Sequence, residues 1–213
     1  MPEVKICGLS TAATLEAALQ AGADYVGLMF YEPSPRNVSI EEAAPLAELA
    51  RGRAKIVAVT VDADDALIKG IAEHVRPDYI QCHGSESAER IEEIAGLAGC
   101  KVIKALKIRG AEDLAEADDY ADAASLMLYD AKVPEGFKNP LPGGNGVQFD
   151  WRLLGRQKNA NPFMLGGGID ITNVADAIAI ANPAIIDVSS GVETSPGQKN
   201  EELIRAFLAQ AKA

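Results

Sequence analysis

Eight times along this chain, a short run of apolar and β-branched residues is followed by a turn and then by a segment with helical periodicity. Such runs predict strands, and apolar residues that recur every three or four positions predict helices. This alternation is typical of right-handed βαβ units around a parallel sheet. The predicted strands cover residues 4–7, 25–30, 55–61, 79–83, 101–106, 126–130, 163–165 and 185–189.

Two of the intervening segments illustrate how clearly the helices can be read. Ser39, with Glu42 three residues later, has the pattern of a capping box and predicts a helix that continues to about residue 50. Residues 111–124 are rich in Asp and Ala, with only Leu114 and Tyr120 as apolar anchors. We also expect a helix there.

The number of repeats indicates how the sheet is arranged. Eight βα units in 213 residues match a closed (β/α)₈ or TIM barrel, and no linker divides the chain, so we expect an α/β fold with one TIM-barrel domain over residues 1–213. The alternative is a doubly wound open sheet, which would need a Gly-x-Gly-x-x-Gly turn after the first strand. The stretch "CGLSTAAT" has one glycine there, so the barrel is favoured.

Charge and composition narrow the possible partners. The net charge is −11 and Lys and Arg form no cluster, which argues against binding to nucleic acid or to an anionic membrane surface. No apolar run approaches the length of a membrane span, and the N-terminus has no signal-peptide pattern. We therefore expect a cytoplasmic protein with no membrane partner.

The cysteines and histidines do not suggest a metal centre. Cys7, Cys82 and Cys100 are odd in number and widely spaced, as expected for reduced thiols. His74 and His83 are the only histidines, and no pair of Cys or His has a metal-ligand spacing. We expect no metal site.

Alternation along the strands predicts which side chains face the barrel interior. Val4 and Ile6 form the natural outward pair, which turns Lys5 and Cys7 inward, and the same reasoning turns Gln81 and His83 inward. Carboxyl ends of barrel strands carry the active site. The polar residues expected to meet at that rim are Cys7, His83, Asp130, Asp187 and Ser189.

Each of these residues also has a purely structural interpretation. An acid or a serine at a strand end is commonly a helix cap or a turn residue, and His83 beside Gly84 could simply bond a loop backbone. Their joint placement at one rim favours a functional site.

Glycine-rich stretches follow the last three strands: "LPGGNG", "LGGGID" and "DVSSGVETSPG". Loops at this end of a barrel bind phosphate through backbone N–H groups, which glycine allows to approach closely. One such loop would be read as a turn, whereas three on the same rim favour a phosphate site. Arg36, in "YEPSPRNVS", is either a carboxylate contact or an ordinary surface arginine.

The motifs "KICGLS", "GLMFYEPSPRNVS", "IQCHGSE", "GGNGVQFDW", "LGGGIDITNV" and "DVSSGVETSPGQKN", in this order, resemble the phosphoribosylanthranilate isomerases of tryptophan biosynthesis. The resemblance covers nearly the whole chain. It implies an aldose–ketose isomerase that converts N-(5-phosphoribosyl)anthranilate to 1-(2-carboxyphenylamino)-1-deoxyribulose 5-phosphate by an Amadori rearrangement. It also implies a small phosphosugar partner, no metal or organic cofactor, and a monomer or homodimer.

The resemblance assigns roles to individual residues. Cys7 would be the general base and Asp130 the general acid, Arg36 would hold the anthranilate carboxylate, and Asp187 would lie near the sugar and the amine. A cysteine base acts as a thiolate, and inward Lys5 is the candidate cation that would stabilise it. With His83 close to the substrate, the remaining contacts would be Gly143, Gly144, Gly146, Gly167, Gly168, Ser189, Ser190 and Gly191.

Two rival functions stay open. Cys7 and His83 could act as nucleophile and base in an acyl-transfer enzyme. The chain could also be a barrel that binds a phosphosugar without catalysis.

Overall fold

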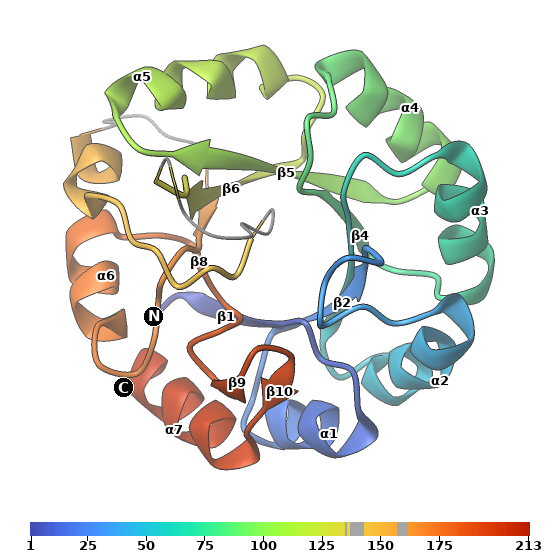
Figure 1. Cartoon of the computed structure of the whole chain (residues 1–213), viewed down its shortest axis with the longest axis horizontal. Helices are drawn as coiled ribbons and strands as arrows, with labels where there is room; N and C mark the ends of the chain where they lie inside the picture. The colour runs from blue at the N-terminus through green and yellow to red at the C-terminus, as the bar shows by residue number, and fades with distance from the viewer. Residues whose placement is uncertain (135, 137–142, 157–161) are drawn as a thin grey trace.

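Eight parallel strands form a closed barrel in chain order, ringed by helices, in the computed structural model (Figure 1). The structure describes residues 1–134, 136, 143–156 and 162–213, so residues 141 and 142 of the "LPGGNG" stretch lie outside the described part. The barrel strands are β1 (Glu3–Cys7), β2 (Tyr25–Phe30), β3 (Lys55–Thr60), β4 (Tyr79–Cys82), β5 (Lys101–Ile108), β6 (Leu126–Ala131), β7 (Phe163–Leu165) and β8 (Ile185–Val188).

Helical segments connect the strands on the outside of the barrel. A short antiparallel hairpin, β9 (Glu193–Ser195) with β10 (Gln198–Lys199), follows β8. The helical segments are α1 (Ala12–Gln20), α2 (Ile40–Ala50), α3 (Asp65–His74), α4 (Ala88–Ala98), α5 (Ala111–Leu114), η1 (Ala115–Tyr120), η2 (Trp151–Arg156), α6 (Val174–Ala181) and α7 (Glu201–Ala211).

Pairing between the first and last strands closes the sheet. Lys5 on β1 is in register with Tyr25 on β2 and with Asp187 on β8. An open doubly wound sheet has no such pair, so the predicted TIM barrel is confirmed and the open-sheet alternative is wrong.

The core has two layers, as alternation along the strands requires. Val4 and Ile6 belong to the large apolar cluster that contains the residues packed between strands and helices. Cys7 and Leu128 belong to a smaller cluster on the other face of the sheet, inside the barrel. The predicted direction of the β1 side chains is therefore confirmed.

The predicted boundaries lie within a few residues of the observed ones, except in the region of residues 111–124. The capping box of Ser39 and Glu42 is present at the start of α2. The expected long helix over residues 111–124 is wrong, because the segment contains only the short helix α5 and the 3₁₀ helix η1. No residue of η1 is buried, so packing gives that segment little support as a regular α-helix.

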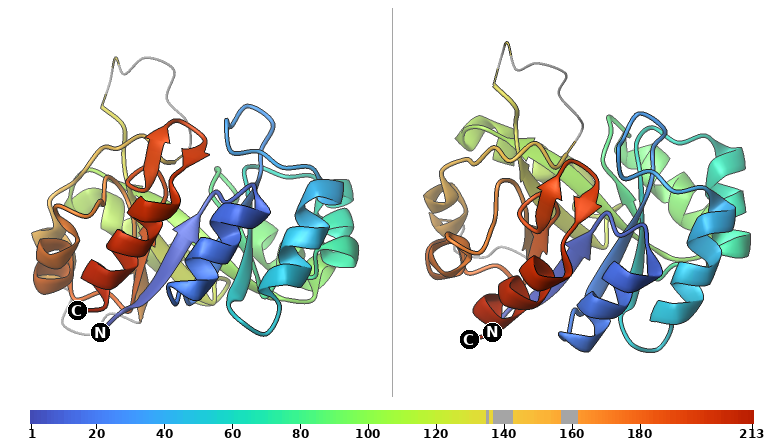
Figure 2. Two further views of the ribbon diagram at one scale, coloured as in Figure 1. Left: turned by 90° about the horizontal axis from the view of Figure 1, so that it is seen from below. Right: turned by 60° about the horizontal axis from the view of Figure 1, so that its bottom comes forward.

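The two ends of the barrel differ. Both termini lie at one end, whereas the β9–β10 hairpin lies at the other, where the strands finish (Figure 2). Among the described residues, no helix has the length and apolar content to cross a membrane.

Candidate active site

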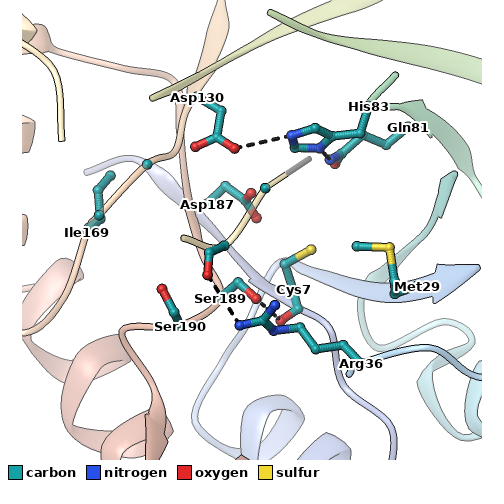
Figure 3. Close-up of a pocket in the computed structure, with 14 residues that line it drawn as sticks. Cys7, Met29, Arg36, Gln81, His83, Asp130, Ile169, Asp187, Ser189 and Ser190 are labelled. Atoms are coloured by element: carbon teal, nitrogen blue, oxygen red, sulfur yellow. Dashed lines mark hydrogen bonds and ion pairs between the residues drawn. The ribbon is translucent and has the colours of Figure 1, made fainter. Parts of the chain in front are cut away.

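A pocket opens at the carboxyl ends of the barrel strands; we call it the rim pocket (Figure 3). The space between its walls amounts to about 490 Å³, which includes solvent at the open mouth. The predicted site residues that line it are Cys7, Arg36, His83, Asp130, Gly143, Gly144, Gly167, Gly168, Asp187, Ser189 and Ser190. Met29, Gln81 and Ile169 complete the lining.

Cys7 is the last residue of β1 and is 5% exposed. Gly27 faces it from β2, and a Cβ atom at Gly27 would lie 2.9 Å from Cys7 Sγ. The glycine therefore provides the space that the thiol occupies.

The surroundings of Cys7 favour the protonated thiol. Burial raises the pKa of the Cys7 thiol, and Asp187 adds to this effect. Lys5 and Lys199 lower that pKa but do not outweigh burial. Lys5 therefore acts on the thiol in the direction expected of the candidate cation, but the cost of desolvation is larger than the attraction to its ammonium group.

Lys5 forms a buried ion pair with Asp187 next to the thiol. Lys5 Nζ lies 2.9 Å from Asp187 Oδ1, and the lysine side chain is fully buried. Burial would lower the pKa of Lys5, but Asp187 and Cys7 raise it overall, so the ammonium form is retained.

Asp130 lies at a different side of the rim pocket and contacts His83 (Figure 3). His83 Nε2 is 3.1 Å from Asp130 Oδ2, and the other oxygen of Asp130 accepts a hydrogen bond from the N–H of Ala131 at 2.8 Å. Gly143 covers this pair, since a Cβ atom there would lie 2.8 Å from His83 Nε2.

Arg36 is buried and already holds a carboxylate of the chain itself. Its Nε and Nη2 donate to the two oxygens of Glu193 at 2.7 and 2.8 Å. Lys199 Nζ donates to the same carboxylate at 2.6 Å and to the backbone oxygen of Ser189 at 2.9 Å. Burial would raise the pKa of Glu193, but the Arg36 and Lys199 contacts lower it, so the carboxylate is ionised.

The glycine loops differ in how close they come to the rim pocket. Gly144 has a φ of 72° and its carbonyl accepts a hydrogen bond from Arg36 Nη2 at 3.4 Å. Gly146 and Gly191 do not line the pocket. Gly191 instead forms a backbone bridge with Asp170, and a Cβ atom would collide with the carbonyl oxygen of Ile169.

Several residues of the site were not selected from the sequence. Alternation placed Gln81 inside the barrel, and that was the signal that could have identified it. Glu193 and Lys199 gave no comparable signal in the sequence. The β9–β10 hairpin brings them next to Arg36, although Glu193 lies 157 residues after Arg36 in the chain.

The fold and the rim pocket define a TIM-barrel enzyme whose site combines a thiol, a carboxyl group and glycine-lined loops. The sequence model of the family described as N-(5'phosphoribosyl)anthranilate (PRA) isomerase matches residues 4–210. The chain belongs to this family.

Individual relatives agree with this assignment. The chain is 53% identical, over 99% of its length and 96% of the relative, to an N-(5'-phosphoribosyl)anthranilate isomerase of Rhodopseudomonas palustris (strain BisA53). The crystal structure of phosphoribosyl anthranilate isomerase from Thermotoga maritima superimposes with a TM-score of 0.88 at 33% identity, covering 100% of this chain and 99% of that one. A further isomerase structure, in complex with reduced 1-(o-carboxyphenylamino)-1-deoxyribulose 5-phosphate, has a TM-score of 0.85 at 31% identity, with 100% and 99% coverage.

Proposed function

We propose that the rim pocket isomerises N-(5'-phosphoribosyl)anthranilate, the substrate named for the family, with Cys7 as general base and Asp130 as general acid. The observation that carries these roles is the geometry. The two side chains come from β1 and β6 and line one pocket, so both can reach a sugar held between them.

The reaction needs an acid and a base in turn. Asp130 would give a proton to the ring oxygen of the furanose, so that the C1–O bond breaks while the nitrogen lone pair forms a C=N⁺ bond. Cys7 thiolate would then remove the C2 proton, and those electrons would neutralise the iminium to give an enolamine. The enolamine gives the ketone by moving its hydroxyl proton to C1. Each proton transfer can contribute about 10²- to 10⁴-fold.

Ionisation of Cys7 is the demanding step, since burial raises its pKa. Lys5 and Lys199 are the cations whose attraction favours the thiolate. We therefore assign Lys5 to the support of the base, with Asp187 balancing its charge and facing the sugar.

Arg36 supports recognition of the anthranilate carboxylate. One edge of its guanidinium is bound to Glu193, while Nη1 has no hydrogen bond within the described part of the chain. That N–H group is available for a second carboxylate, and an arginine already fixed at one edge loses little freedom on binding.

The phosphate would lie against the loops after β7 and β8. Gly167, Gly168, Ser189 and Ser190 line that side of the rim pocket and supply backbone N–H and hydroxyl groups. Gly146 and Gly191 would act indirectly, through loop shape. This arrangement agrees with the phosphate sites common in TIM barrels.

The acyl-transfer alternative is not favoured. Both ring nitrogens of His83 are engaged, by Gln81 and by Asp130, and neither is hydrogen bonded to Cys7. No observation favours a barrel without catalysis over the isomerase.

A fluorescence assay that follows the loss of phosphoribosylanthranilate tests this function directly. Turnover by the wild-type chain is the expected result, and its absence with folded protein would refute the proposal. We further propose a cytoplasmic enzyme, a monomer or homodimer in solution, that acts on this phosphosugar and needs no cofactor.

A further inference from the structure

A continuous line of buried polar side chains leads to Asp130 from the opposite side of the barrel. Lys5 Nζ lies 2.8 Å from Gln81 Oε1, and Gln81 Nε2 lies 2.8 Å from His83 Nδ1. His83 Nε2 then reaches Asp130. Lys5 and Gln81 are fully buried, and His83 is 6% exposed, so these groups satisfy one another rather than bonding to bulk water.

The chemistry of Lys5 decides which way Gln81 faces. An ammonium group can only donate hydrogen bonds, so the Gln81 oxygen must face Lys5. The NH₂ group of Gln81 then faces His83.

The orientation of Gln81 in turn decides where the proton of His83 sits. An amide NH₂ group is a donor, so His83 Nδ1 must accept with its lone pair. The ring proton of the neutral imidazole is then on Nε2, which points at Asp130 Oδ2.

This tautomer matters for a carboxyl group that gives up a proton. Asp130 receives one N–H at each oxygen, from His83 at Oδ2 and from the backbone of Ala131 at Oδ1. Both donors stabilise the carboxylate that remains after proton transfer, and both fix the direction of the group. If His83 carried its proton on Nδ1 instead, a lone pair would face the Asp130 carboxylate.

We propose that Gln81 is a positioning residue for the acid step: it holds His83 as the Nε2–H tautomer, which in turn orients Asp130. This inference rests on the proposed function, in which Asp130 protonates the sugar. Gln81 makes no hydrogen bond to Asp130, so its effect passes through His83.

The first test needs no substrate. The chain has two histidines, and His74 is exposed at the end of α3, so the variant His74→Gln leaves His83 as the only imidazole. Ring ¹⁵N chemical shifts in this variant are expected to show a neutral imidazole with the proton on Nε2. A proton on Nδ1, or an imidazolium near neutral pH, would overturn the proposal.

The second test reverses the polarity of Gln81 at nearly constant shape. In Gln81→Glu an accepting carboxylate oxygen replaces the NH₂ group, so we expect the proton of the neutral His83 ring to move from Nε2 to Nδ1. We expect kcat to fall about 10- to 10²-fold, less than the about 10²- to 10⁴-fold of a general acid itself, with KM little changed. The matched control is Gln210→Glu, the same change of charge on the exposed face of α7, which should retain wild-type kcat and KM.

Two results of the second test would contradict the proposal. One is an unchanged kcat although the His83 proton has moved from Nε2 to Nδ1. The other is a loss of kcat with Nδ1 still unprotonated, which would indicate a purely structural role. If Gln81→Glu does not fold, the wild-type tautomer still decides, and a wild-type chain with the expected tautomer but no isomerase activity would refute the proposed function alone.

Discussion

Replacement of Glu193 by Gln removes the charge that holds Lys199 next to Arg36, a residue that lines the rim pocket. The carboxylate accepts hydrogen bonds from Arg36 at both oxygens and from Lys199 at Oε1, and all three side chains are at most 3% exposed. Whichever way the new amide turns, its NH₂ group faces at least one N–H donor. Two buried cations are then left with a neutral partner.

The expected cost lies at the lower end of the about 3–5 kcal/mol lost when one partner of a buried ion pair is removed. Burial lowers the pKa of Lys199, while Glu193 raises it, so without Glu193 the lysine can lose its proton and relieve part of the penalty. About 3 kcal/mol corresponds to a fall in Tm of about 6–12 °C for a chain of this size.

The same substitution should also weaken substrate binding. Arg36 is fixed by Glu193, and a freed guanidinium pays the entropy of ordering when it binds a carboxylate. An ordering cost of about 0.5–1.5 kcal/mol would raise KM by roughly 2- to 10-fold.

Thermal unfolding and steady-state kinetics measure both effects. Glu193→Asp, which keeps the charge and shortens its reach, should lie between the wild type and Glu193→Gln in both. A Glu193→Gln variant with unchanged Tm and unchanged KM would show that the Arg36 contact is incidental, and the reasoning would be refuted.

Three further predictions concern the Cys7 thiol, the glycine that leaves room for it, and Asp113, which lies away from the site. Because burial raises the pKa of Cys7, kcat should increase as pH rises above neutrality, as the fraction of thiolate grows; a rate that is flat from about pH 6 to 9 would contradict this ionisation. Gly27→Ala places a Cβ atom 2.9 Å from Cys7 Sγ, so it should lower the stability by about 1–3 kcal/mol and should also lower kcat. The control Gly96→Ala in α4, where a Cβ atom meets nothing within 4 Å, should be neutral or stabilising. Equal unfolding midpoints for the two variants would refute the argument that the Cβ atom crowds the thiol. Burial would raise the pKa of Asp113, but Lys132 and two backbone N–H groups lower it to about 2, so its contribution to stability is present above about pH 4 and is lost as pH falls towards 2. Denaturant unfolding should therefore show a gap between the wild type and Asp113→Asn at neutral pH that narrows from about pH 4 downwards, and a gap independent of pH would be inconsistent with that shift.

Much of the architecture could be predicted from the sequence because local chemistry determines it. The alternation of apolar residues fixed which face of β1 and β4 turns inward, and thus placed Cys7 and Gln81 inside the barrel. The cap at Ser39 was equally local. The prediction of a long helix over residues 111–124 was wrong. The segment has few apolar anchors, so packing does not favour a long helix over the short helices that form there.

The parts that could not be predicted depend on contacts between distant segments or on the balance of opposing effects. Glu193 meets Arg36 only after the barrel has closed and the hairpin has formed. The direction of the Cys7 pKa shift depends on whether desolvation or Lys5 is stronger, and alternation identifies both influences without ranking them. The tautomer of His83 likewise required the contacts of Gln81 on both sides.

The roles of Cys7 and Asp130 are tested most directly by the turnover of the variants Cys7→Ser and Asp130→Asn. Binding of reduced 1-(o-carboxyphenylamino)-1-deoxyribulose 5-phosphate, as an analogue of the product, is measured in parallel. Both side chains line one pocket, so each variant should lose at least about 10²-fold in kcat while affinity for the analogue is largely retained. A kcat near that of the wild type in either variant, with the protein folded, would remove that residue from the chemistry and contradict the account.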